Sequence, residues 1–162
     1  MMKISLTIVS LFLVAIACLY LFWSSGDQPL FALTGVTPTN LGINDNKLAA
    51  CPSSPNCVSS QAIDPQHYIA PIQYQSSNPE AYSKLKQLVE SQKRTQIIAQ
   101  TDNYIYAQTT SRLMGFVDDV EFYFRPDTQL IEVRSASRLG ESDLGVNRQR
   151  IEQIRLKFHG LN

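Results

Sequence analysis

Charged side chains gather in two neighbouring stretches of the C-terminal half, where their types and spacing could support chemistry. The first stretch, VDDVEFYFR, holds three carboxylates, and the second, VRSASRLGESDLGVNRQR, holds arginines and an asparagine. The candidate binding residues are Asp118, Asp119, Glu121, Arg134, Arg138, Asn147 and Arg148. Paired carboxylates can hold a cation or exchange a proton, and arginines can bind a phosphate or carboxylate through forked hydrogen bonds.

The same residues also fit a structural role. If the two stretches form a simple hairpin, Asp118, Asp119 and Glu121 on one strand face the arginines of the other, and ion pairs form across the strands. No Gly-rich phosphate loop and no nucleophile elbow accompanies them. The structural interpretation is favoured, no catalytic residue is assigned, and a hydrolase that uses these carboxylates stays an alternative.

A second feature with chemical potential is the cysteine pair in CPSSPNCVSS. Five residues separate Cys51 from Cys57, more than paired metal ligands usually have, and His67 is the nearest histidine. A redox pair normally has two intervening residues at a helix start, which Pro52 and Pro55 disfavour. Because oxidising surroundings favour pairing, we expect a structural disulfide, with redox-active thiols or a metal site as alternatives. No metal and no cofactor is predicted.

The compartment depends on the N-terminal segment. Residues 4–23 carry no charge, and twenty residues at about 1.5 Å each span about 30 Å, the thickness of the bilayer core. Lys3 precedes this run and the next basic residue is Lys47, so the positive-inside rule places the remaining chain outside the cytoplasm. An uncleaved transmembrane helix is favoured. Acylation of Cys18 as in a lipoprotein, or plain cleavage, are alternatives that predict the same compartment, with the periplasmic side of an inner membrane favoured.

The elements that must position these residues follow from hydrophobic periodicity. Residues 1–23 are expected to form the anchor or signal, 24–47 a flexible linker, and 48–162 one domain. The expected strands are 68–74, 95–101, 104–112, 117–125 and 130–137, and the expected helices are 78–92 and 147–159. Asn147 is expected to be the N-cap of the second helix. Short turns between neighbouring strands require antiparallel pairing. The sequence therefore predicts an α+β fold, a mostly antiparallel meander sheet with two helices packed on one face.

Three stretches together are similar to a known family. They are CPSSPNCVSS with His67 downstream, GFVDDVEFYF, and VRSASRLGESDLGVNRQRIEQIR. Over residues 48–158 the chain resembles the bacterial and plastid domain of unknown function 1499 family. The resemblance implies that twelve residues belong to a recurring pattern: Cys51, Cys57, Asp118, Asp119, Glu121, Arg134, Ser135, Arg138, Asp143, Gly145, Asn147 and Arg148. The family has no established activity, so the resemblance implies no catalytic role.

Composition and motifs together favour a binding protein. Lysine plus arginine number 14 and aspartate plus glutamate 14, so the total charge does not indicate nucleic-acid binding. We expect a membrane-anchored extracytoplasmic domain that binds an anionic or lipidic ligand or maintains the cell envelope, without catalysis. A hydrolase that uses Asp118, Asp119 or Glu121, and a thiol-redox protein that uses Cys51 and Cys57, are the alternatives. No particular protein partner is predicted.

Overall fold

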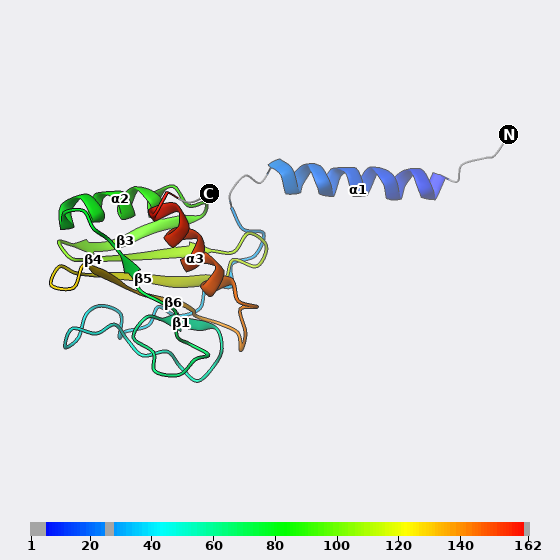
Figure 1. Ribbon diagram of the computed structural model, residues 1–162. Helices are drawn as coiled ribbons and strands as arrows, with labels where there is room; N and C mark the ends of the chain where they lie inside the picture. The colour runs from blue at the N-terminus through cyan, green and yellow to red at the C-terminus, as the bar shows by residue number, and fades with distance from the viewer. Residues whose placement is uncertain (1–5, 25–27, 161–162) are drawn as a thin grey trace.

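The computed structural model describes residues 6–24 and 28–160, and Figure 1 shows an α+β domain with one further helix beside it. In chain order the elements are α1 (Leu6–Ser24), β1 (Cys57–Ser59), β2 (Ile72–Gln73), α2 (Asn78–Glu90), β3 (Thr95–Thr101), β4 (Tyr104–Thr110), β5 (Val117–Arg125), β6 (Leu130–Ser137) and α3 (Val146–Phe158). The α+β class and the antiparallel meander predicted from the sequence are confirmed.

The six strands form one sheet in the order β1-β6-β5-β4-β3, and β2 also pairs with β6. Every pairing of these named strands is antiparallel. The turn at Asp102–Asn103 joins β3 to β4, and the turn at 126–129 joins β5 to β6, as predicted. Along β6, β2 pairs with its first half and β1 with its second half, so β6 is almost wholly enclosed.

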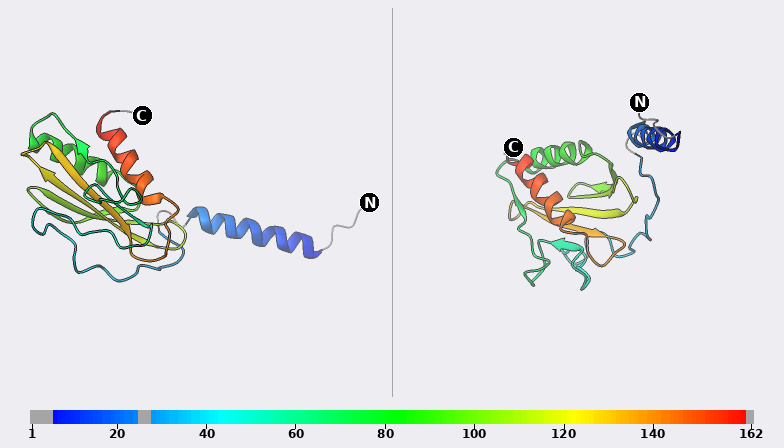
Figure 2. Two further views of the ribbon diagram at one scale, coloured as in Figure 1. Left: turned by 60° about the horizontal axis from the view of Figure 1, so that its bottom comes forward. Right: turned by 90° about the vertical axis from the view of Figure 1, so that its right-hand side faces the viewer.

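Helices α2 and α3 cover one face of the sheet (Figures 1 and 2). A capping box between Ser77 and Glu80, with proline in the first turn, starts α2. The buried side chains of α2 are Ala81, Leu85 and Val89, and the apolar ones of α3 are Ile151, Ile154 and Phe158. These apolar stripes pack on Phe122, Phe124 and other apolar residues of the sheet to form the main core.

The opposite face of the sheet is covered by irregular chain. Leu48 packs in a second apolar cluster with three tyrosines of the sheet, and Leu41 and Ile43 pack against the same cluster. We call residues 41–48 the covering segment. The structure describes every residue of the covering segment, and the one β-bridge within the segment is an isolated antiparallel pair between Asn44 and Lys47. The segment lies almost entirely in the stretch predicted as a linker.

Two element predictions need correction. The strand expected over 68–74 is reduced to β2, because Pro71 has no N–H to donate to a ladder, and Tyr68 instead forms an isolated parallel bridge with Ser59. Strand β1 was not predicted, since its three residues sit directly behind the proline-rich cysteine loop. Strands β1 and β2 both pair with β6. Because β6 is distant in the chain, this pairing produces no pattern in the sequence around either strand.

The N-terminal helix α1 stands apart from the sheet in Figures 1 and 2. A helix within 4–23 is therefore confirmed, although the predicted range begins outside the described residues. Among the residues that the structure describes, no helix combines the length and the apolar character needed to cross a membrane. The assignment of this helix as a transmembrane span is not confirmed.

Candidate functional site

The seven predicted site residues do not form one patch, because alternation along β5 divides them between two faces of the sheet. Asp118 shares its face with Val120 and the helices, whereas Asp119 and Glu121 point to the opposite face. Arg134 and Arg138 lie with Asp119 and Glu121, whereas Asn147 lies with Asp118, to which Ser137 connects it. The two groups are therefore separate polar clusters.

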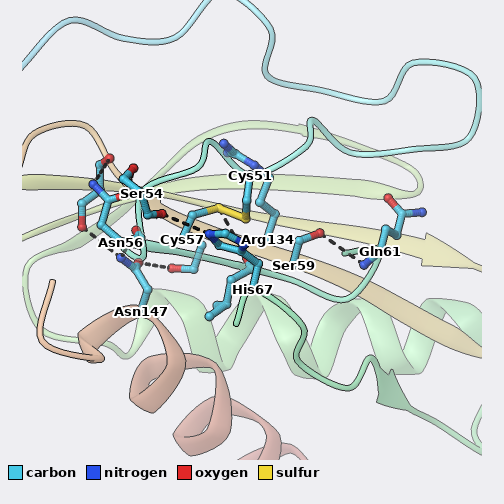
Figure 3. Close-up of a disulfide and its surroundings, with 12 residues drawn as sticks. Cys51, Ser54, Asn56, Cys57, Ser59, Gln61, His67, Arg134 and Asn147 are labelled. Carbon is cyan, nitrogen blue, oxygen red and sulfur yellow. Dashed lines mark hydrogen bonds between the residues drawn. A yellow bond between two sulfur atoms is a disulfide. The ribbon is translucent and has the colours of Figure 1, made fainter. Parts of the chain in front are cut away.

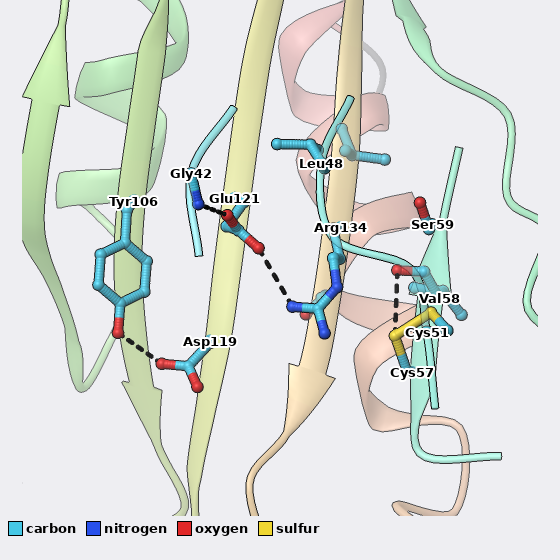
Figure 4. Close-up of polar contacts among 12 residues, drawn as sticks. Gly42, Leu48, Cys51, Cys57, Val58, Ser59, Tyr106, Asp119, Glu121 and Arg134 are labelled. Atoms are coloured by element: carbon cyan, nitrogen blue, oxygen red, sulfur yellow. Dashed lines mark hydrogen bonds and ion pairs between the residues drawn. A yellow bond between two sulfur atoms is a disulfide. The ribbon is translucent and has the colours of Figure 1, made fainter. Parts of the chain in front are cut away.

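Glu121 is the centre of the first cluster and is fully buried. Strand register places it opposite Arg134, whose Nη1 lies 3.1 Å from Glu121 Oε2. The Tyr104 hydroxyl donates to Oε1 at 2.7 Å, and the Gly42 amide of the covering segment donates to the same oxygen at 2.8 Å. Figure 4 shows Gly42, Glu121 and Arg134 in line across the strands. One carboxylate thus ties β4, β6 and the covering segment to β5.

Asp119, two residues before Glu121 on β5, has a similar environment. Arg138 binds it with two nitrogens, Nε to Oδ2 at 2.9 Å and Nη2 to Oδ1 at 2.7 Å. The Tyr106 hydroxyl donates to Oδ1 at 2.6 Å and accepts from Gln108 Nε2 at 2.7 Å. Asp119 is 1% exposed. The predicted ion pairs between the strands are confirmed for Asp119 and Glu121, whereas Asp118 pairs with Arg150 of α3. The two confirmed pairs and the two tyrosines make what we call the polar face: Tyr104, Tyr106, Asp119, Glu121, Arg134 and Arg138.

Burial fixes the protonation of the polar face. Burial and the neighbouring Glu121 carboxylate raise the pKa of Tyr104 well above its ordinary value. Burial and the hydrogen bond to Asp119 likewise raise the pKa of Tyr106. The hydrogen bond to Asp119 also raises the pKa of the Arg138 guanidinium. Both tyrosines therefore keep their protons at neutral pH and act as hydrogen-bond donors to carboxylates.

The second cluster joins α3 to the sheet. Asp118 accepts from the Ser137 hydroxyl at 2.6 Å and from Arg150 Nη2 at 2.5 Å. Arg150 Nη1 also donates to Asn147 Oδ1 at 2.6 Å, and Asn147 Nδ2 donates to the Asn56 carbonyl at 3.0 Å. Asn147 has no exposed surface. This cluster holds the start of α3 against both β5 and the residue that precedes β1.

The prediction that Asn147 caps α3 is wrong. The N-cap is Gly145, with a φ of 82° that suits glycine, and Asn147 lies inside the first turn. The side chain of Asp143 takes the capping role, because its carboxylate accepts from the Gly145 amide at 3.1 Å and from the Asn147 amide at 2.7 Å. The Asn147 side chain is thereby released to point into the sheet.

Arg148 belongs to neither cluster. It is partly exposed on α3 and donates to two backbone carbonyls, Tyr68 at 2.7 Å and Gln66 at 2.8 Å. These bonds fasten the loop before β2 to the helix. Of the three arginines proposed for anion binding, Arg134 and Arg138 hold carboxylates and Arg148 holds carbonyl oxygens.

Figure 3 shows the cysteine loop beside Arg134 of the polar face. Cys51 and Cys57 form a disulfide with an S–S distance of 2.03 Å, as favoured from the sequence. His67 is 7% exposed, and its Nε2 lies 3.1 Å from the Ser54 carbonyl oxygen inside that loop. Its Nδ1 lies 2.7 Å from Asp64 Oδ1. Within residues 6–24 and 28–160, no three His, Cys, Asp or Glu side chains are grouped to hold a metal ion.

The remaining cysteine, Cys18, is free and exposed on α1. Its position leaves the sulfur accessible. Whether it carries a lipid stays a prediction from the sequence.

The arrangement of the carboxylates favours structure over proton transfer. A general base must come within hydrogen-bond reach of a substrate proton. Asp119 and Glu121 are instead 1% and 0% exposed and already accept from arginine and tyrosine. Pockets of about 580 Å³, lined by Tyr74, Lys84 and Phe158 among others, and of about 550 Å³, lined by Tyr82 and Asp102 among others, lie elsewhere.

Three side chains and one segment of these clusters were not predicted from the sequence. Tyr104 and Tyr106 lie on a predicted strand, and their two-residue spacing, which matches that of Asp119 and Glu121, indicates a shared face. Arg150 lies one helical turn beyond Asn147, a spacing that points both side chains the same way. The covering segment gave no signal, since no apolar period runs through it.

Comparison with known proteins places the chain in one family. The family model described as protein of unknown function (DUF1499) matches residues 47–158, which include both polar clusters and the disulfide. No curated protein and no solved structure matches the chain. Because the matched range exceeds two thirds of the chain, this protein belongs to the DUF1499 family.

Proposed function

We propose that this protein is an exported, non-catalytic domain that works at the outer surface of a membrane and binds a lipidic ligand there or maintains the cell envelope. Residues 4–23 attach it to the membrane, either as a helix or through a lipid on Cys18. The periplasmic side of an inner membrane is the compartment that fits this attachment.

The observation that carries the proposal is the state of the ionisable groups in the polar face. Each carboxylate is buried and paired with an arginine of the same sheet, at 3.1 Å for Glu121 with Arg134 and 2.7 Å for Asp119 with Arg138. An anionic ligand would have to displace a carboxylate from each arginine. A catalytic base would have to leave its pair. Both requirements favour a lipidic ligand over an anionic one, and binding over catalysis.

Two further features support location outside the cytoplasm. The Cys51–Cys57 disulfide suits an oxidising compartment. The apolar side chains of α1 are exposed on the isolated chain, with Leu11 at 69% and Phe12 at 67%, and a helix that is apolar all round requires a cover such as lipid. We interpret the same disulfide as structural rather than redox-active, because Cys57 is 1% exposed.

Topology is tested with reporters fused after Asn162. Alkaline phosphatase, which needs an oxidising compartment, should be active in that fusion, and a green fluorescent protein fusion should be dark when exported in the unfolded state. A fusion of the same reporters after a chain that lacks residues 4–23 is the control and should reverse both signals. A phosphatase that stays inactive in the full-length fusion, with bright fluorescence, overturns the proposed location.

Ligand class is tested by what stays bound to the full-length protein in mild detergent. Native mass spectrometry should show lipid adducts on the protein, and the intact mass shows whether Cys18 is acylated. Reproducible binding of a soluble anion without lipid would contradict the lipidic assignment. Turnover of a hydrolase substrate that disappears in the Asp119→Asn variant would contradict the non-catalytic one.

A further inference from the structure

Exposed apolar side chains gather at the end of the domain from which the chain continues to α1. Six of the thirteen exposed large apolar side chains among residues 28–160 lie in three short segments. They are Leu30, Phe31, Leu33, Leu113, Phe116 and Leu139, and we call this group the apolar end. Their exposed fractions run from 36% for Phe116 to 57% for Phe31.

Backbone contacts join the first two segments into one surface. The Phe31 amide donates to the Leu113 carbonyl, and the Leu33 amide to the Met114 carbonyl, both at 3.1 Å. Gly115 permits this close approach, because a Cβ at that position would lie 2.0 Å from the Phe31 carbonyl oxygen. The loop between β4 and β5 therefore holds residues 30–33 in a fixed place.

The third segment packs beside the other two. A Cβ at Gly35 would lie 3.0 Å from Leu139 Cγ, so the chain after Leu33 runs directly over Leu139. The Arg138 amide also donates to the Val117 carbonyl at 3.1 Å, which ties the end of β6 to the start of β5. In Figure 2 the loops that carry these residues gather near the base of α1.

The length of the connection limits where this surface can lie. Leu30 follows the last residue of α1, Ser24, by six residues, and an extended chain covers at most about 3.5 Å per residue. The apolar end must therefore stay within about 20 Å of the end of α1. If residues 4–23 enter a bilayer, as the proposed function holds, the surface of that bilayer is within reach of the apolar end.

We infer that the apolar end rests on the lipid surface to which residues 4–23 attach the chain. This inference rests on the proposed function and adds to it the face of the domain that meets the membrane. Leucine and phenylalanine side chains enter the boundary between headgroups and acyl chains readily. The sheet then stands with its β4–β5 loop and the end of β6 toward the membrane. The turn at 126–129, at the other end of β5 and β6, points away from it.

The test uses the full-length protein in vesicles of dibrominated phosphatidylcholine, which quenches nearby tryptophan. Trp23 is the one tryptophan of the chain, so in the wild type it reports attachment. In a Trp23→Phe background, Leu113→Trp probes the apolar end, and Ile98→Trp on β3 is the matched control, with exposed fractions of 51% and 45% for the native residues. Phe116→Trp replaces Leu113→Trp if circular dichroism shows that the latter fails to fold.

Quenching should be several-fold stronger for Leu113→Trp than for Ile98→Trp, with Trp23 quenched in the wild type. If Trp23 is quenched and the two probes are quenched equally, the inference is overturned while the proposed attachment stands. A blue-shifted but unquenched Leu113→Trp emission also overturns it, because protein rather than lipid then covers the apolar end. If Trp23 itself is not quenched, the proposed attachment and the inference fail together.

Discussion

Replacement of Glu121 by glutamine tests whether the polar face holds the fold together. The variant keeps the shape of the side chain and one acceptor oxygen for Tyr104 and Gly42, but it removes the charge that Arg134 faces at 3.1 Å. Arg134 is 4% exposed, and its Nε already has no hydrogen-bond partner. The variant therefore leaves a buried guanidinium without a counterion.

The expected loss of stability follows from that uncompensated charge. Removal of one partner of a buried ion pair costs about 3–5 kcal/mol, a large part of the roughly 5–15 kcal/mol that stabilises a typical domain. At roughly 4 °C per kcal/mol for a domain of this size, the Tm should fall by about 12–20 °C. Asp127→Asn is the matched control, because its pair with Arg125 is largely exposed and should cost less than about 1 kcal/mol.

The assay is urea unfolding of the full-length protein in mild detergent, followed by near-ultraviolet circular dichroism of the tyrosines. Tryptophan fluorescence would not serve, since Trp23 lies outside the domain. The double variant Glu121→Gln with Arg134→Met should be more stable than Glu121→Gln alone, because it removes the unpaired charge as well. The reasoning is refuted if Glu121→Gln loses no more stability than Asp127→Asn.

Three further predictions concern the same framework. Stability should fall as pH rises above about 10, because Tyr104 has a raised pKa in the folded protein and therefore loses its proton first in the unfolded chain. In Tyr104→Phe the urea midpoint should fall less steeply with pH than in the wild type, and an equally steep fall would contradict this prediction. Cys51→Ser with Cys57→Ser should cost roughly 2 kcal/mol in the same assay, and no measurable cost would mean that the bridge does not stabilise the domain. Asn147→Ala should cost at least about 1–3 kcal/mol, since buried partners lose their hydrogen bonds, whereas exposed Gln149→Ala should be nearly neutral; similar losses would contradict a structural role for Asn147.

Local patterns were sufficient for most of the fold. Alternation in VDDVEFYFR placed Val120, Phe122 and Phe124 on the core face, and helical spacing placed Ile151 and Ile154 on the sheet. The β5–β6 turn was short enough to fix the register, and with it the pair of Glu121 and Arg134. In each case the interacting residues lie on one element or on two elements joined by a tight turn.

The prediction that Asn147 caps α3 shows where local patterns fail. Asparagine before a helix usually caps it, but here Asp143 supplies the cap and the asparagine side chain is drawn into the sheet. Its partners, which include Asn56 and Ser137, come from distant parts of the chain. The preference of one residue type was overridden by contacts that exist only after the sheet and helix have packed.

The sequence by itself determined the types of the elements other than β1 and β2, the antiparallel meander, the cysteine pairing favoured in oxidising surroundings, and the opposite charges that face each other on β5 and β6. Only the tertiary structure decided that residues 41–48 cover the polar face and that Arg150 pairs with Asp118. The physical reason is the separation of the interacting residues along the chain. Periodicity and turn chemistry act between residues a few positions apart, whereas the Gly42 amide and the Glu121 carboxylate are 79 residues apart. They meet only when this face of the sheet is buried, because each buried polar group then requires a hydrogen-bond partner.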